Sequence, residues 1–258
     1  MKFPLRLSLD LWRARMSQHS ASKRAEAIFH LPAAMLPALH ETEGDGVLDG
    51  NAHSAADSVR TAERTRAAVL WIGGGEPLDH AEVGRVTFAL NGKGRNIFLH
   101  TDGQRLRQRI HEFRPDPRLF LTVELSGREK IHDASFGREG AFRRAMEGIR
   151  AAKLSGFHVC AHVTVNGNTD VGETGELFDS LDRYDIDGYV VSSGGRATAA
   201  ARGVLEETLE DIRALVRCSR WESFSRLLEA SYAARGERAA VAVTPVPEGE
   251  GGAVEESA

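Results

Sequence analysis

Short apolar runs alternate with amphipathic stretches over most of the chain. Five runs have the length and composition of buried strands, at residues 67–70, 96–100, 119–125, 157–165 and 188–192. Apolar residues at helical spacing follow each run and predict helices at 78–90, 104–113, 139–155, 172–184 and 204–216. This repeated order of strand, turn and helix predicts a parallel sheet with right-handed crossovers. The expected fold is therefore α/β, a (β/α) barrel or part of one.

The segment before the first of these runs is less regular. Residues 27–39 are apolar but interrupted by Pro32 and Pro37, so we expect one short strand followed by irregular chain. Residues 41–57 are rich in Gly, Asp, His and Ser and predict a loop, after which residues 58–66 can form a helix leading into the next strand.

The two ends of the chain differ in character. Residues 3–16 repeat apolar side chains every three or four positions, at Leu5, Leu9, Trp12 and Met16. This amphipathic helix can pack on the domain or rest on a membrane surface, and we favour packing because a short, weakly basic helix binds bilayers poorly. The last residues are rich in Pro, Gly and Glu, which predicts disorder. We therefore divide the chain into an N-terminal helix at 1–24, a barrel at 25–234 and a disordered tail at 235–258.

Composition excludes several classes of protein. With 41% hydrophobic residues, the 258-residue chain can bury a full core. Its net charge of −4 provides no positive electrostatic field to attract nucleic acid, so we expect no nucleic-acid partner. The only cysteines, Cys160 and Cys218, are far apart, which argues against a disulfide scaffold and a metal site. No signal peptide or run of about 20 apolar residues occurs, so we expect a cytoplasmic protein without a transmembrane segment.

A glycine-rich turn follows the run at 67–70. Gly74 and Gly75 permit positive φ and let a ligand approach the backbone, Glu76 places a carboxylate at the mouth, and Pro77 suits the first position of a helix. These residues can cradle a small charged ligand. A tight strand-to-helix turn needs the same glycines and proline without any ligand, so the residues alone leave both interpretations open.

Other polar turns follow the later strands, where ligand sites of parallel (β/α) folds lie. They are at residues 101–103, 124–127, 165–168 and 192–195. The adjacent pair His132 and Asp133 suggests proton transfer, but neighbours in sequence seldom face each other. Asp133 is better placed as a helix N-cap or turn residue before Ala134, so we assign no catalytic residue.

In this order, the motifs resemble the radical S-adenosylmethionine superfamily. Residues 74–77 look like its GGEP motif on the second strand, and residues 101–103 look like its TNG turn on the third. Residues 119–167 are similar to the adenosylhopene transferases of hopanoid biosynthesis, which have an HD pair, a G-x-F helix start and an AK-x-x-GF helix end. The matching positions are 132–133, 140–142 and 152–157, and the whole resemblance covers residues 67–195, about half of the chain.

The resemblance implies a partial (β/α) TIM-like barrel and a site for S-adenosylmethionine. Gly74, Gly75 and Glu76 would receive the aminoacyl end, with the carboxylate and backbone carbonyls accepting from the ammonium. Residues at later strand ends would contact the ribose and adenine, namely Glu124, Ser126, Asn166 and Ser192. A solvated strand end or a capped loop explains these four residues as well.

Several features depart from the family pattern. The family holds an iron–sulfur cluster through CxxxCxxC after the first strand, because such clusters need thiolates. The matching stretch, 32–40, contains no cysteine, and His30 and His40 are its only nearby nitrogen ligands. Asp102 replaces the Asn of the third-strand turn, and Ser126 stands where the relatives have Asp. The relatives also continue into a cysteine-bearing C-terminal region. Because residues 32–40 contain no cysteine, we do not expect a cluster here.

Three functions remain open. The first is a degenerate relative of the adenosylhopene transferases without a cluster, acting as a binding or accessory protein linked to hopanoid biosynthesis. The second is an active enzyme that transfers 5′-deoxyadenosyl to a hopanoid precursor with a cluster held at an atypical site. The third is a truncated or decayed gene product. The partner expected in the first case is a small molecule, with peripheral membrane contact through the N-terminal helix left open.

Overall fold

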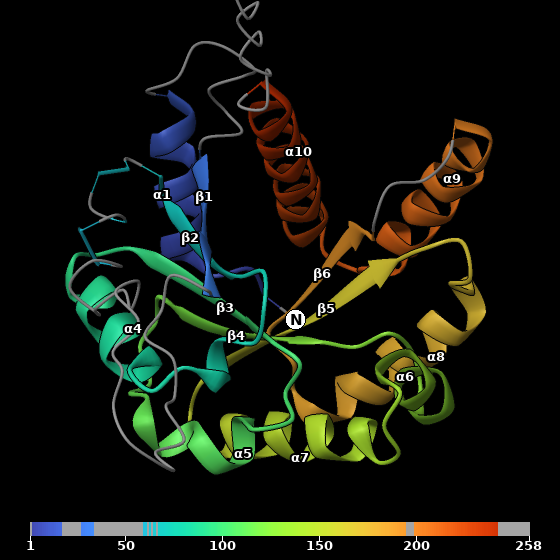
Figure 1. Cartoon of the computed structure of the whole chain (residues 1–258), viewed down its shortest axis with the longest axis horizontal. Coiled ribbons are helices and arrows are strands. Elements are labelled where there is room, and N and C mark those ends of the chain that lie inside the picture. The colour runs from blue at the N-terminus through green and yellow to red at the C-terminus, as the bar shows by residue number, and fades with distance from the viewer. Residues whose placement is uncertain are drawn as a thin grey trace, which may run out of the picture.

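The computed structural model describes residues 2–16, 27–33 and 59–241, with gaps at 61, 63, 66 and 195–198. Six parallel strands form one sheet in the order β1-β2-β3-β4-β5-β6, so each strand pairs with its neighbour in the chain. Their bounds are β1 Ile28–Pro32, β2 Val69–Gly73, β3 Asn96–Thr101, β4 Leu119–Glu124, β5 His158–Val165 and β6 Gly188–Ser193. The sheet curves into a half-barrel (Figure 1), which confirms the predicted α/β partial barrel.

Helices that follow the strands cover the convex side of the sheet (Figure 1). They are α4 Val83–Gly92, α5 Leu106–Arg109, α6 Glu129–Phe136, α7 Ala141–Leu154, α8 Val171–Leu181 and α9 Ala199–Leu215. Short 3-10 turns lie at η3 Pro77–Asp79, η4 Ile110–Glu112 and η5 Asp182–Tyr184. Every residue of β2 is buried, as expected for a strand covered on both faces.

The predicted strands are confirmed, whereas several predicted helices differ. The helix expected at 78–90 is divided into η3 and α4, and the helix expected at 104–113 is divided into α5 and η4. Helix α6 was not predicted. Residues 59, 60 and 62 are helical, in part of the helix expected at 58–66, whereas the loop expected at 41–57 lies outside the described residues.

The largest departure from prediction is α10, Ser219–Val241, which lies against the concave side of the sheet and contacts β6 and β1 (Figure 1). The close approach depends on Gly188, because a Cβ there would lie 2.2 Å from Cε2 of Trp221. Helix α10 continues to Val241, past residue 235, where the predicted tail begins. Residues 242–258 lie outside the described part of the chain.

Aromatic rings pack under α10 on the concave face. Trp71, Phe98 and Phe120 are in register on adjacent strands, and the centroids of Phe98 and Phe120 are 4.5 Å apart. Phe224 of α10 stacks on Phe98 at 4.7 Å. This layer packs in the interior of the half-barrel between the sheet and α10.

Helix α1, Leu5–Met16, confirms the predicted amphipathic helix, but its apolar stripe does not face the domain. Leu7 is fully buried, whereas Leu5, Leu9, Trp12 and Met16 are 70%, 45%, 58% and 62% exposed. The helix therefore packs on the domain as expected, but through Leu7 rather than through this stripe. Nowhere in the described part of the chain does a helix combine the length and the apolar character that crossing a bilayer requires.

Candidate functional site

A polar cavity of about 590 Å³ lies at the carboxyl ends of the strands. Residues of β1, β2, β3, β5 and β6 line it, together with residues 229–235 of α10. Trp71 of β2 forms part of the wall. A volume of this size falls in the range of small-molecule and cofactor sites.

Two histidines and a serine form a hydrogen-bonded chain along the wall of this cavity. Nε2 of His100 lies 2.8 Å from Nδ1 of His162, and Nε2 of His162 lies 2.7 Å from Oγ of Ser192. Trp71 packs against both imidazoles, with ring centroids 5.5 Å away in each case. A neutral imidazole donates from one nitrogen and accepts at the other, so the chain is satisfied with its donors pointing in either direction.

Burial keeps these imidazoles neutral. It lowers the pKa of His100 to about 4, although the nearby Asp102 carboxylate acts in the opposite direction. Burial, followed by the neighbouring His100, lowers the pKa of His162 well below its usual value. The wall of the cavity therefore presents neutral donors and acceptors near pH 7.

Glu124 adds a carboxylate to the same network. Its Oε2 lies 3.7 Å from Nε2 of His100, and its Oε1 accepts a hydrogen bond of 3.2 Å from Thr164. Burial raises the pKa of Glu124, an effect that the bond from Thr164 opposes and the charge of Asp102 reinforces. Burial therefore makes the neutral form of both Glu124 and His100 more favourable than it is for exposed groups of the same type.

Glu76 joins the turns that follow β2 and β3. Its Oε1 accepts from the amide of Leu78 at 2.9 Å and from the hydroxyl of Thr101 at 2.7 Å, and its Oε2 accepts from the amide of Asp102 at 2.7 Å. Burial and the charge of Asp102 raise the pKa of Glu76 to about 8 despite these three donors. The carboxylate thus holds the two turns together and is not part of the cavity lining.

Gly74 and Gly75 have positive φ, at 75° and 143°. A Cβ on Gly74 would meet no atom within 4 Å, so the backbone conformation, rather than crowding, requires glycine there. Gly74 lines the cavity, and its peptide edge is accessible to a ligand.

The other two predicted site residues lie outside the cavity lining. The amide of Ser126 donates to Nδ1 of His132 at 3.3 Å, which fixes the loop after β4. Oδ1 of Asn166 accepts from the amide of Asn168 at 2.9 Å, so this side chain caps its own turn. Of the seven predicted residues, the structure brings Gly74 and Ser192 to the cavity and links Glu124 to it through His100.

The predicted role of Asp133 as a cap before Ala134 is wrong, because Asp133 lies inside α6. Its carboxylate instead accepts from the amides of Gly140 and Phe142, at 2.7 and 2.8 Å, and so fixes the start of α7. His132 is buried beside Phe136, and its ring also contacts the ring of Phe142 edge-on at 5.8 Å. The HD and G-x-F motifs thus form a junction between two helices.

Sequence reasoning missed the residues that define the cavity most directly. His100 and His162 lie in predicted strands, where each is a polar residue among apolar neighbours. Since alternate residues of a strand share a face, this pattern could have indicated that both side chains face the site. The missed α10 supplies Glu229, which accepts from the amide of Ser193 at 2.8 Å and so ties the helix to the end of β6. Tyr232 and Arg235 of α10 complete the lining.

The described residues do not fit an iron–sulfur cluster. Cys160 is fully buried in β5, where burial raises the pKa of its thiol, and Cys218 lies between α9 and α10. No cysteine occurs anywhere between β1 and β2. Within the described ranges, no three His, Cys, Asp or Glu side chains converge on a point that could hold a metal ion. His30 is engaged by Ser231, with Nε2 and Oγ 2.7 Å apart.

Comparison with known proteins agrees with the parallel half-barrel fold. The family model described as "Radical SAM superfamily" matches residues 49–183, just over half of the chain, and the chain belongs to this superfamily. No curated protein sequence matches the chain.

Solved structures with the same fold include SuiB of Streptococcus suis. SuiB bound to its precursor peptide SuiA aligns with a TM-score of 0.53 and 15% identity, over 73% of this chain and 46% of SuiB. SuiB bound to S-adenosylmethionine aligns with a TM-score of 0.54 and 16% identity, over 72% of this chain and 44% of SuiB. The chain thus spans less than half of the length of these structures, and the similarity concerns the fold.

Proposed function

We propose that this chain is a cluster-free member of the radical S-adenosylmethionine superfamily that binds a small polar molecule and acts as a binding or accessory protein. The observation on which this rests is the polar cavity of about 590 Å³ at the strand ends, in a chain without thiolates to hold a cluster. S-adenosylmethionine or a close relative is the proposed ligand. A SuiB structure of the same fold contains S-adenosylmethionine, which supports this choice.

In this proposal the cavity residues divide between two ends of the ligand. The peptide edge at Gly74 receives the aminoacyl group, and Gly75 and Glu76 shape the turn that presents it. The neutral chain through His162 and Ser192 donates to and accepts from a ribose or a nucleobase, which carry both kinds of group. Glu124 acts on the ligand indirectly, through its contact with His100. Ser126 and Asn166 stabilise neighbouring loops.

The proposed link to hopanoid biosynthesis rests on the similarity of residues 119–167 to the adenosylhopene transferases. Within that segment, Asp133, Gly140 and Phe142 build the junction of α6 and α7. These motif residues therefore support relatedness in fold, and the biosynthetic context needs its own test. Co-purification of the chain with a tagged adenosylhopene transferase is that test, and an absence of any complex would remove the link.

Calorimetric titration of the protein with S-adenosylmethionine tests ligand binding. Ser192→Ala removes a partner of His162 and should weaken binding about tenfold. Ser180→Ala is the matched control, because Ser180 bonds to the carbonyl of Leu177 in α8, away from the cavity. Equal affinities of the two variants, or no heat with the unaltered protein, would contradict the proposal.

An active radical enzyme is the second candidate, and membership of the superfamily favours it. Anaerobic reconstitution with iron and sulfide separates the two candidates. We expect a colourless protein and no release of 5′-deoxyadenosine. About four irons per chain with a broad visible absorption band would instead establish a cluster at an atypical site.

A further inference from the structure

Helix α1 has apolar side chains on two opposite faces. Leu7 on one face is fully buried in the core, and Leu11 packs beside it. On the other face lie four exposed apolar side chains, which we call the α1 stripe: Leu5, Leu9, Trp12 and Met16. Residues three and four positions apart share a helix face, so the stripe is continuous over three turns. Core packing therefore explains only one of the two apolar faces.

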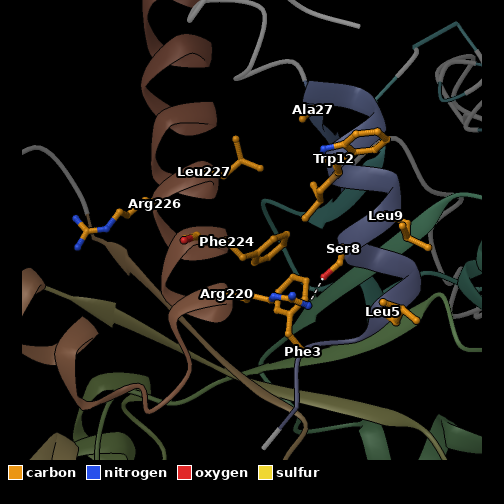
Figure 2. Close-up of a pocket in the computed structure, with 12 residues that line it drawn as sticks. Phe3, Leu5, Ser8, Leu9, Trp12, Ala27, Arg220, Phe224, Arg226 and Leu227 are labelled. Atoms are coloured by element: carbon orange, nitrogen blue, oxygen red, sulfur yellow. Dashed lines mark hydrogen bonds between the residues drawn. The ribbon is translucent and has the colours of Figure 1, made fainter. Parts of the chain in front are cut away.

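The apolar surface continues from the stripe toward α10. A groove of about 690 Å³ lies between the two helices, with Phe3, Phe224 and Leu227 among its lining residues. Figure 2 shows the stripe residues Leu5, Leu9 and Trp12 along α1, with Ser8 directed at Arg220 of α10. Nη1 of Arg220 donates to the Ser8 hydroxyl at 3.1 Å and fixes the width of the groove there.

The flanks of the stripe are cationic. At 100° per residue, Arg6 and Arg13 fall on one side of it, and Arg220 lies on the other side, across Ser8. The only acidic residue of α1 is Asp10, which reaches Arg13 at 3.5 Å and is otherwise turned toward the domain. There it accepts from Asn96 at 3.0 Å. Arginines therefore lie on both flanks of the stripe although the whole chain has a net charge of −4.

We propose that the α1 stripe docks the protein on an anionic lipid surface. Apolar side chains at the centre of an exposed helix face, with arginines on both flanks, match a bilayer interface, where acyl chains lie below a layer of phosphates. A bilayer deforms around single protruding side chains, whereas a stable protein partner must bury about 800 Å² of matching surface. The four side chains of the α1 stripe protrude singly from one twelve-residue helix, so they suit the lipid surface better.

Tryptophan fluorescence reports this docking directly. The chain has three tryptophans, and Trp71 and Trp221 are buried, so a change of environment on binding reports Trp12. With vesicles of phosphatidylcholine containing roughly one third phosphatidylglycerol, we expect a blue shift and quenching by lipids brominated along the acyl chain. Vesicles of phosphatidylcholine alone should bind more weakly, and salt at about 1 M should release the protein by screening the arginines.

Two kinds of variant separate the apolar and electrostatic contributions. Leu9→Glu places a charge in the stripe and should reduce co-sedimentation with the anionic vesicles about tenfold or more. Arg6→Glu should weaken binding to anionic vesicles and leave binding to neutral ones unchanged. Phe88→Glu is the matched control, because Phe88 is a comparably exposed apolar residue, at 59%, on α4. Its binding should equal that of the unaltered protein.

Three results would overturn the proposal. No blue shift with anionic vesicles would refute docking on lipid. Equal loss of binding in Leu9→Glu and Phe88→Glu would refute the stripe as the docking surface. Self-association in sedimentation velocity that Leu9→Glu abolishes, without vesicle binding, would assign the stripe to a second copy of the chain. None of these results depends on a ligand in the strand-end cavity.

Discussion

Nε2 of His100 and Nδ1 of His162 lie 2.8 Å apart, although 62 positions separate the two residues in sequence. They come from β3 and β5, with β4 between them, and the curvature of the half-barrel lets their side chains meet on the concave side. Because Trp71 covers both rings, the pair is held in a wall of the cavity rather than in solvent. Because His162 also bonds to Ser192, this contact links the predicted residue Ser192 to His100.

Stability should fall in mild acid because of this pair. The pKa of His100 is lowered to about 4 in the folded state by burial, against an unfolded value of 6.5. The unfolded chain then binds more protons between these values, so stability is full above about pH 6.5 and decreases toward pH 4. The loss from His100 alone is about 3 kcal/mol at most. Urea unfolding at a series of pH values measures it, and His100→Gln should flatten the curve; an unchanged slope in the variant would refute the assignment.

Glu76 should act in the opposite direction. Its folded pKa is about 8, against 4.5 unfolded, mainly through burial and then through the charge of Asp102. The folded chain therefore binds more protons between these values, and stability should decrease as the pH rises through this window. Glu76→Gln keeps a neutral group at this position, so its stability should not decrease as the pH rises from about 6.5 to 8, while the increase due to His100 between about pH 4 and 6.5 should remain. Parallel unfolding curves for variant and unaltered protein would contradict this account.

Gly188→Ala should destabilise the fold by about 3 kcal/mol or more. The added Cβ would lie 2.2 Å from an indole carbon of Trp221, which is fully buried and has no room to move. Denaturant unfolding is the measurement. Gly203→Ala is the matched control, because a Cβ at this position of α9 meets nothing within 4 Å and helices favour alanine by about 1 kcal/mol. Similar effects of the two substitutions would mean that α10 does not pack closely on β6.

Thr122→Val should stabilise the protein by about 1 kcal/mol. Thr122 is fully buried in β4, and its hydroxyl has no hydrogen-bond partner among the described residues. Valine has nearly the same shape and removes a polar group that water would otherwise solvate. A rise of the thermal unfolding midpoint measures the effect, whereas a fall would indicate that the hydroxyl has a partner in solution.

Thiol labelling should distinguish the two cysteines. Cys160 is fully buried, with a pKa raised by burial, and Cys218 is half-buried. In native protein we expect a disulfide reagent to modify at most one thiol, at Cys218, and in denatured protein both, because only an accessible thiolate reacts. Rapid native labelling of Cys218→Ser would show that Cys160 is accessible and would reopen its role as a ligand.

Part of the site was predictable from sequence, and part was not. The turn with Gly74 was found because glycines with positive φ leave a local signature, and Ser192 was found because ligand sites follow strand ends. His100 and His162 were missed, since each is an isolated polar residue in an apolar strand until the sheet curvature brings them together. The seven predicted residues therefore included only two that line the cavity, Gly74 and Ser192.

The sequence by itself determined the order of the parallel strands, most of the helices between them and the absence of cysteines between β1 and β2. These follow from local periodicity, turn chemistry and composition, which depend on near neighbours in the chain. Only the tertiary structure decided that α10 fills the concave side and that the α1 stripe faces outward. A helix with two apolar faces can bury either one, and the choice of Leu7 over Leu9 depends on the shape of the core that residues far away in sequence build.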